Sequence, residues 1–242
     1  MPFDRQDSTP GQSADILRLE EVSKTFYVKP VFGAAKRVEA LRNVSLSLAP
    51  GRALALVGES GSGKSTVGKL ILQHYPVSSG RILFEGGDIA EMSGRADQLC
   101  YRRAVQMVFQ DPFSALNPAH TIRHHLQRAL RLHQPDHCNE AAVKRLLEEV
   151  ELDAASTPDK YPHELSGGQR QRVNFARALA VNARLIVADE PTSMLDVSIR
   201  KSVLALMQRL KDERGLSLLY ITHDIATAEY LAEDTAVMFR GQ

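Results

Sequence analysis

A glycine-rich segment near residue 60 has the composition of a phosphate-binding loop. Gly58 to Ser65 reads Gly-Glu-Ser-Gly-Ser-Gly-Lys-Ser, which fits the spacing GxxxxGK[ST] between an apolar run and a helical pattern. In such a loop, backbone N–H groups turn inward around phosphate oxygens, and the helix N-terminus adds partial positive charge. We expect Lys64 to contact the β- and γ-phosphates of a nucleotide and the Ser65 hydroxyl to bind Mg²⁺. A glycine-rich turn that only enters a helix is the alternative, and the flanking apolar run disfavours it.

Two adjacent carboxylates follow a second apolar run. Leu185–Ala188 is typical of a buried strand, and Asp189 and Glu190 come directly after it. Open α/β sheets bind ligands at the carboxyl ends of their strands. We therefore expect Asp189 to hold Mg²⁺, directly or through water, and Glu190 to polarise the attacking water as a general base. Without the phosphate loop upstream, the same residues would fit a strand that leads into a capped helix equally well.

A second helix start has the composition of an anion site. Leu165-Ser-Gly-Gly-Gln169 precedes Arg-Gln-Arg and opens a helical pattern. Helix N-termini with small residues bind anions, although an ordinary capped helix has similar residues. One nucleotide does not need two such helix starts. The sequence therefore predicts that this loop binds a nucleotide held by another copy of the fold.

Short apolar runs alternate with helical patterns along most of the chain. Ala53–Val57, like the run before Asp189, has the continuous apolar character of a strand buried on both faces. Alternating strands and helices predict an α/β protein with a largely parallel sheet covered on both sides. Strands are expected at 16–22, 26–28, 39–48, 53–57, 81–84, 105–109, 185–188, 218–222 and 236–239, and helices at 64–74, 122–132, 140–152, 168–180, 199–214 and 225–233.

The middle of the chain has helical patterns only. From residue 112 to residue 181 strand signals are absent, which predicts a helical subdomain (112–181) inserted into a core formed by 15–111 and 182–242. Residues 1–14 are polar, and we expect a disordered leader before a single domain that spans 15–242.

Composition excludes several classes of function. The 30 Lys and Arg residues nearly balance the 29 Asp and Glu residues, which argues against a protein that coats nucleic acid by bulk charge. Cys100 and Cys138 have no CxxC spacing, so we expect reduced thiols and no metal knuckle. No apolar stretch approaches the roughly 20 residues of a membrane span. The chain could still dock on a protein that crosses a membrane.

These motifs together resemble the nucleotide-binding domain of an ABC (ATP-binding cassette) ATPase. The segments that carry the resemblance are Gly58–Thr66, Gln110, Leu165–Gln169, Leu185–Glu190 and His223. The resemblance covers nearly the whole chain, and the LSGGQ loop is highly specific to the class. It implies a P-loop NTPase (RecA-like) core with a mostly parallel sheet, an N-terminal antiparallel β-subdomain and an inserted helical subdomain.

The resemblance also implies roles for single residues. Gln110 would sense Mg²⁺ and the transmembrane partner, His223 would be the switch histidine at the γ-phosphate, and Ser193–Asp196 would form a dimer contact. The implied catalytic residues are Lys64, Gln110, Glu190 and His223, and the implied ligands of Mg²⁺ are Ser65, Gln110 and Asp189.

The implied ligand is MgATP, sandwiched in a head-to-tail dimer with a second ABC ATPase subunit. An aromatic ring is expected to stack on adenine, and Phe26 is the better candidate by position, with Tyr27 next. ATP would contact Phe26, Gly58, Glu59, Ser60, Gly61, Ser62, Gly63, Lys64, Ser65 and Thr66 of one subunit and Ser166, Gly167, Gly168 and Gln169 of the other.

Longer strings resemble one branch of the family. Gln110–Pro118, Pro191–Ser198 and the insertion Val28–Val38 are similar to ATPases of dipeptide, oligopeptide and nickel importers. This resemblance implies a peripheral subunit on the cytoplasmic face of the cell membrane, with permease subunits docked near Gln110–Pro118 and an extracytoplasmic substrate-binding protein as an indirect partner. Phe113, Leu116 and Pro118 would form a surface-facing apolar cluster for the permease, unless they cap the helical subdomain internally. Importers of this branch usually continue beyond the last strand, whereas this sequence stops at residue 242.

Three other functions compete with a transporter subunit. A soluble ABC ATPase of DNA repair or translation would carry coiled-coil insertions or two cassettes, for which 242 residues leave no room. A regulatory cassette without turnover would be expected to lack Glu190 or His223. A P-loop kinase would not need Leu165–Gln169.

Overall fold

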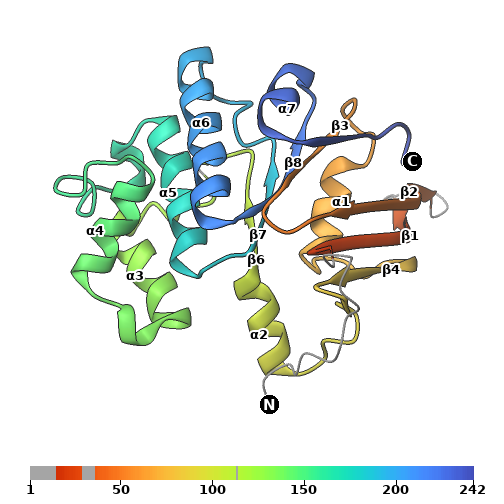
Figure 1. Cartoon of the computed structure of the whole chain (residues 1–242), viewed down its shortest axis with the longest axis horizontal. Helices are drawn as coiled ribbons and strands as arrows, with labels where there is room; N and C mark the ends of the chain where they lie inside the picture. Colours follow the sequence, from red (N-terminus) through yellow and green to blue (C-terminus); the bar gives the residue numbers. More distant parts are fainter. Residues whose placement is uncertain (1–14, 29–35, 113) are drawn as a thin grey trace.

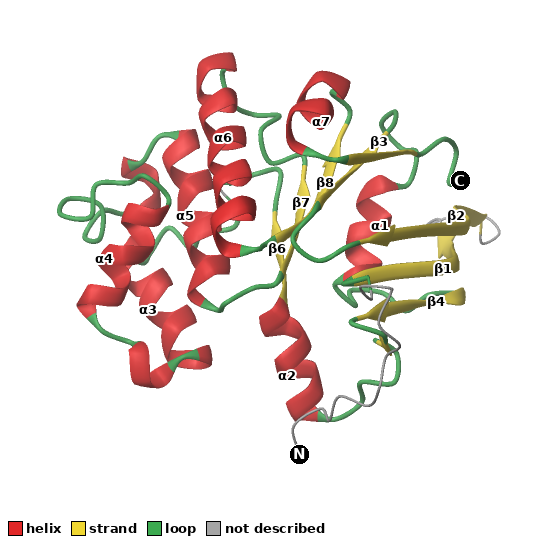
Figure 2. Cartoon of the chain, in the orientation of Figure 1, coloured by secondary structure: helices red, strands yellow, loops and turns green. Residues whose placement is uncertain are grey.

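The computed structural model describes residues 15–28, 36–112 and 114–242. The predicted leader 1–14 and most of the predicted insertion lie outside these residues. Two sheets and their helices form adjoining layers, with the helical block on one side of a central sheet and the second sheet on the other (Figure 1). The architecture is the predicted α/β fold, with one parallel and one antiparallel sheet (Figure 2).

The central sheet is parallel and has the strand order β6-β7-β8-β3-β9. Val57 pairs beside Thr222, and Asp189 pairs beside Ile221. The residues that follow β3, β7 and β8 therefore leave the sheet side by side at one edge. The strands are β3 Ala53–Val57, β6 Val105–Val108, β7 Leu185–Asp189, β8 Ser217–Thr222 and β9 Asp234–Val237.

The second sheet is antiparallel and has the strand order β2-β1-β4-β5. Its strands are β1 Leu17–Val28, β2 Lys36–Leu48, β4 Ser79–Phe84 and β5 Gly87–Asp88. The prediction of two strands at 16–22 and 26–28 was wrong, because β1 stays paired with β2 through register shifts between Val22 and Thr25. Between the two sheets lies α1 (Lys64–Ile71), whose buried apolar side chains join the two layers in one core.

The helical block agrees with the sequence pattern. Residues 114–181, all of which the structure describes, contain helices and 3-10 turns and no strand. The helices α3, α4 and α5 contact one another, and α6 packs on α5. The bounds are α3 Ile122–His133, the 3-10 turns Pro135–His137 and Pro162–Glu164, α4 Glu140–Glu149, α5 Gly167–Ala180, α6 Val197–Arg214 and α7 Ile225–Leu231.

Some helix predictions were wrong in extent, and one helix was missed. The predicted helix 64–74 ends at Ile71, because Gln73 adopts a left-handed backbone conformation. Likewise α4 ends before Glu151, whose φ is also positive. The missed helix is α2 (Arg95–Ala104), which buries only Tyr101 and Ala104 and therefore shows no clear apolar period.

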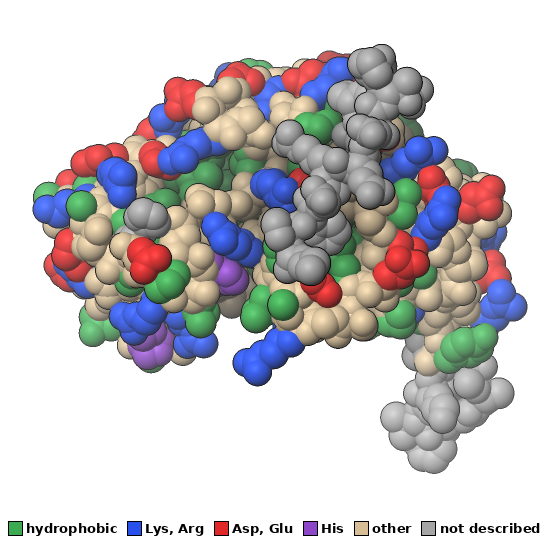
Figure 3. Space-filling model, turned by 60° about the horizontal axis from the view of Figure 1, so that its bottom comes forward, with side chains coloured by type: hydrophobic (Ala, Val, Ile, Leu, Met, Phe, Trp, Pro, Cys, Tyr) green, Lys and Arg blue, Asp and Glu red, His purple; other side chains and the backbone are tan. Residues whose placement is uncertain are grey.

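Surface properties agree with the balanced composition. On the face shown in Figure 3, cationic and anionic side chains are interspersed over the described part of the chain. Among the residues that the structure describes, none of the helices combines the length and the apolar character that a membrane-spanning helix requires.

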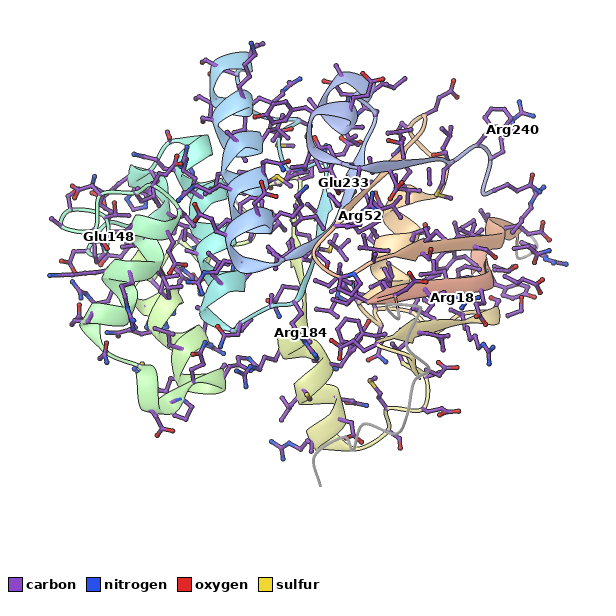
Figure 4. The ribbon with its side chains drawn as sticks, in the orientation of Figure 1. Arg18, Arg52, Glu148, Arg184, Glu233 and Arg240 are labelled. Atoms are coloured by element: carbon purple, nitrogen blue, oxygen red, sulfur yellow. The ribbon has the colours of Figure 1, made fainter. Side chains whose placement is uncertain are left out.

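An ion pair between a buried lysine and a half-buried glutamate connects α6 to the sheet. Lys211 on α6 is 4% exposed and pairs with Glu233, whose other carboxylate oxygen accepts a 2.7 Å hydrogen bond from the Ala53 amide. Figure 4 labels Glu233, which lies between α7 and β9. Burial by itself would raise the pKa of Glu233, but the hydrogen bonds from Lys211 and Ala53 hold that pKa below its usual value. The stabilisation is therefore present above the pKa of the unfolded chain and is lost as pH falls through the folded pKa.

We predict that Glu233→Gln lowers the free energy of unfolding by about 2 kcal/mol, because it leaves the buried Lys211 ammonium without its counter-charge. The control is Glu213→Gln on α6, the helix that carries Lys211, where an exposed carboxylate lies 3.8 Å from Arg209. That change is expected to cost no more than about 0.5 kcal/mol. Urea unfolding at pH 7 measures both, and equal effects of the two variants would refute the assigned role of Glu233.

Candidate functional site

The loop after β3 packs closely against β2 on one side and against the residue that follows β9 on the other. A Cβ atom on Gly58 would lie 2.3 Å from the Met238 carbonyl oxygen, and one on Gly63 would lie 2.8 Å from the Ala40 carbonyl oxygen. Gly63 also has φ of 109°, a left-handed conformation that side chains rarely adopt. Any other residue at these two positions would push the loop away from β2 and the end of β9. Glycine therefore keeps the loop narrow and its backbone amides accessible to a ligand.

The Lys64 side chain is held across this loop. Its ammonium group donates hydrogen bonds to the carbonyl oxygens of Gly58 (2.7 Å) and Glu59 (2.9 Å), and the residue is buried. An ammonium group has three donors, so one remains for a phosphate oxygen in the loop. The position agrees with the predicted phosphate contact, which stays a prediction.

Ser65 and Asp189 meet at the first turn of α1. The Ser65 hydroxyl donates a 3.0 Å hydrogen bond to the Asp189 carboxylate. Burial raises the pKa of Asp189 and the neighbouring Glu190 carboxylate adds to this rise, while the Ser65 hydrogen bond opposes it. The half-buried Asp189 carboxylate and the Ser65 hydroxyl beside it offer two of the hard oxygen ligands that Mg²⁺ prefers.

The described residues contain no cluster of three or more His, Cys, Asp or Glu side chains that could hold a metal ion. Two protein oxygens fit Mg²⁺ nonetheless, because this ion usually keeps several waters and takes its remaining ligands from phosphates. The donor set therefore fits a cation that arrives with a nucleotide.

Glu190 connects the ends of three strands. One of its carboxylate oxygens accepts a 3.2 Å hydrogen bond from the Gln110 amide after β6, and the other lies 3.1 Å from Nδ1 of His223 after β8. Its backbone has φ of 46°, a left-handed conformation that residues other than glycine adopt uncommonly. Three residues that are far apart in sequence and were predicted to be catalytic are thus brought together.

A hollow of about 600 Å³ lies over the phosphate loop. It is large enough for a nucleotide, since ligand pockets usually measure about 300–1,000 Å³. Asp189 and His223 do not line it, but each hydrogen-bonds to a residue that does. The lining residues are Val38, Glu39, Ala40, Arg42, Ser60, Gly61, Gly63, Lys64, Ser65, Thr66, Gln110, Glu190, Arg240 and Gly241.

Several lining residues were not predicted from the sequence. Val38, Glu39, Ala40 and Arg42 come from β2, and no sequence motif marks them. Arg240 lies close to the C-terminal residue (Figure 4) and carries no motif. It reaches the hollow because the Gly241 amide donates a 2.9 Å hydrogen bond to the Ser62 carbonyl oxygen.

The LSGGQ loop does not line this hollow. Ser166 caps α5, accepting a hydrogen bond from the Gln169 amide, while the Gln169 side chain accepts one from the Ser166 amide. The resulting helix N-terminus is well formed and is separate from the phosphate loop of the same chain. Its predicted action on the nucleotide of another copy remains a prediction.

Phe26 and Tyr27 lie on opposite faces of β1. The Phe26 ring meets the edge of the Tyr75 ring at a centroid distance of 5.2 Å, and Phe26 pairs across the sheet with Val38 at the hollow. Tyr27 is 72% exposed. Neither ring lines the hollow itself. The arrangement favours Phe26 over Tyr27 as the residue that an adenine ring would reach.

The predicted docking cluster needs correction. Leu116 is 2% exposed and belongs to the hydrophobic core, so the expectation that it faces a partner was wrong. It anchors its segment from inside, helped by a 2.7 Å hydrogen bond from Arg177 to the Ala115 carbonyl oxygen. Pro118 is exposed as expected, and Phe113 lies outside the described residues.

Comparisons with known proteins agree with these motifs. The family model described as "ABC transporter" matches residues 41–193, which is more than half of the chain. An oligopeptide transport ATP-binding protein of Bacillus subtilis (strain 168), AppF, is 41% identical over 97% of this chain and 72% of its own length. The glutathione import ATP-binding protein GsiA of Pectobacterium atrosepticum is 40% identical over 98% of this chain and 38% of its own length.

Solved structures share the fold. The dimeric post-hydrolysis structure of the ATP-binding cassette MJ0796, bound to ADP and Pi, has a TM-score of 0.78 at 28% identity. It covers 93% of this chain and 95% of its own. The structure of cbiO1 from Clostridium perfringens has a TM-score of 0.80 at 27% identity, covering 94% of this chain and 86% of its own.

We predict that Asp189→Asn makes the ligand-free chain more stable at pH 7, by about 1 kcal/mol. The raised pKa means that the folded chain holds the Asp189 proton more tightly than the unfolded chain does. The ionised carboxylate therefore destabilises the fold at neutral pH, and this penalty fades as pH falls towards the unfolded pKa.

Asparagine keeps the oxygen that accepts from Ser65 and removes the charge. Urea unfolding at pH 7 and pH 5 measures the effect, with exposed Asp136→Asn as the control. A variant no more stable than the parent at pH 7 would contradict the electrostatic penalty at Asp189.

Proposed function

The chain belongs to the ABC transporter family of ATPases, and from that premise we propose that it powers the import of short peptides as one subunit of a membrane transporter. The catalytic part of this proposal rests on one observation. The Glu190 carboxylate is held between Gln110 and His223 at the rim of the phosphate loop. A carboxylate with two fixed partners is oriented for one task, which here is to accept a proton from water.

In the proposed reaction the triphosphate of ATP enters the hollow over the loop. The backbone amides of 58–65 and the Lys64 ammonium bind its phosphate oxygens. Ser65 and Asp189 are the residues that would hold Mg²⁺, with the side-chain oxygen of Gln110 as a further ligand. When bound, the ion neutralises charge that develops on the phosphates.

Glu190 then acts on the attacking water. Its hydrogen bond from Gln110 and its contact with His223 hold both carboxylate oxygens, so the base does not have to be oriented during the reaction. His223 stands beside it at the end of β8, where a γ-phosphate at the loop would come within reach of the imidazole. These residues leave the sheet at one edge because β6, β7 and β8 run parallel.

The proposal includes a head-to-tail dimer. Ser166, Gly167, Gly168 and Gln169 form a helix N-terminus outside the chain's own hollow, which suits a nucleotide held by a second subunit. The dimeric cassette of known structure, similar over 93% of this chain, supports this arrangement.

Peptide import rests on the relatives and on one string of residues. The relative AppF carries the word oligopeptide in its name, GsiA is named for the import of glutathione, itself a short peptide, and the segment Gln110–Pro118 resembles that branch. We further propose permease subunits docked near this segment, an extracytoplasmic substrate-binding protein as their partner, and a peripheral position on the cytoplasmic face of the membrane. No observation favours a soluble ABC ATPase.

We predict that Glu190→Gln lowers the turnover of ATP at least about 100-fold, because glutamine cannot accept the proton. Glutamine keeps the shape and the contacts with Gln110 and His223, so ATP binding is expected to persist and an ATP-bound dimer to accumulate. Phosphate release and size-exclusion chromatography with ATP measure the two effects. Turnover near that of the parent would rule out Glu190 as the base.

We predict that Phe26→Ala raises the KM for ATP about tenfold with little change in kcat, because stacking on a base contributes about 1–3 kcal/mol. Tyr27→Ala is the matched control, since it removes the neighbouring ring on the opposite face of β1 and is expected to leave KM unchanged. The reverse result would assign adenine binding to Tyr27.

A further inference from the structure

Of the two glycines of the LSGGQ loop, Gly168 faces α6 of its own chain and Gly167 faces the segment just before α6. A Cβ atom on Gly168 would lie 2.4 Å from Cγ2 of Ile199, and one on Gly167 would lie 3.2 Å from a terminal methyl group of Leu195. The first distance is far inside van der Waals contact. Ile199 branches at Cβ, so this methyl group has little freedom to turn away. A side chain at position 168 would therefore have to displace Ile199, whatever approaches from outside.

The next residue along α6 contacts the loop that carries His223. A guanidinium nitrogen of Arg200 lies 3.4 Å from one carboxylate oxygen of Asp224. The other Asp224 oxygen accepts from the amides of Ala226 (3.1 Å) and Thr227 (3.4 Å) and so caps α7. Asp224 is thus fixed from two sides, and His223 precedes it directly.

We propose that Ile199 and Arg200, in the first turn of α6, are positioning residues that join the LSGGQ loop to the His223 loop within one subunit. The inference rests on the proposed function, in which the two loops of one subunit serve two different nucleotides. Packed interiors compress little. A shift of α5, caused by the nucleotide of the other subunit, is therefore passed through Ile199 to α6 and through Arg200 to Asp224 and His223.

The steric half of the inference is tested by a double-mutant cycle without nucleotide. Gly168→Ala is expected to lower the folding equilibrium constant roughly tenfold by overpacking, although alanine is the better helix former. In an Ile199→Ala background, where the methyl group at 2.4 Å is gone, the same change is expected to be neutral or stabilising. Ile199→Val keeps the branched methyl group and is the control that should give no relief. Equal effects of Gly168→Ala in all backgrounds would overturn the contact.

The functional half uses dimerisation with ATP in the Glu190→Gln chain. There, Gly168→Ala is expected to weaken the dimer about tenfold, and adding Ile199→Ala is expected to bring it back to within about threefold of the parent. If the second change restores folding but not the dimer, glycine is needed for the ligand rather than for Ile199, and the proposal fails. A Glu190→Gln parent that never dimerises would instead refute the proposed dimer, while the cycle without nucleotide still decides the contact.

Arg200 is tested by its effect on turnover. Arg200→Met is expected to lower kcat about tenfold with an unchanged KM for ATP, because His223 is misplaced while the hollow stays intact. Arg200→Lys keeps a cation for Asp224 and is expected to recover most of the activity. The exposed neighbour Lys201→Met is the matched control. Unchanged kcat in Arg200→Met, or a rise in KM alone, would overturn the positioning role.

Discussion

The parallel pairing of β3, β7 and β8 is the constraint on which the site depends. Each strand is a short apolar run whose side chains are almost completely buried, and their register sets Val57 beside Thr222 and Asp189 beside Ile221. A slip by one residue would turn every side chain to the other face of the sheet. Both faces of these strands are packed, so such a slip would disrupt the packing on each face. Packing therefore fixes the register, and the register brings the phosphate loop, Glu190 and His223 to one edge.

The site itself is electrostatically unfavourable without a ligand. Asp189 and Glu190 are adjacent carboxylates, and burial of Asp189 raises its pKa because nothing cationic compensates it fully. The Lys64 ammonium donates to two carbonyl oxygens of its own loop and has no contact with either carboxylate described here. A divalent cation would supply the positive charge that the two carboxylates lack. The phosphates of a nucleotide would supply the negative charge that Lys64 lacks. The adjacent carboxylates Asp189 and Glu190 thus lower the stability of the ligand-free chain, and such a loss of stability is common at functional sites.

Most of the fold and the residues around the phosphate loop could be predicted because their signals are local. The loop, the Asp189-Glu190 pair and the alternation of strands and helices all appear within short windows of sequence. What failed depends on contacts between distant residues. Leu116 is apolar whether it faces a partner or the core, and only the packing of the helical block decides that it is buried. Arg240 lines the hollow through a backbone hydrogen bond at the end of the chain, for which a sequence offers no sign.

The LSGGQ loop shows how one motif can satisfy two demands. A Cβ atom would leave Gly168 sideways, towards Ile199 on α6, whereas the free N–H groups of the first turn point along the axis of α5. The two directions do not compete. The side facing α6 requires the absence of a side chain, and the open end of the helix requires donors for an anion. Glycine at this position is therefore compatible both with the chain's own packing and with the proposed ligand of a second subunit, and the proposed coupling begins at this contact between α5 and α6.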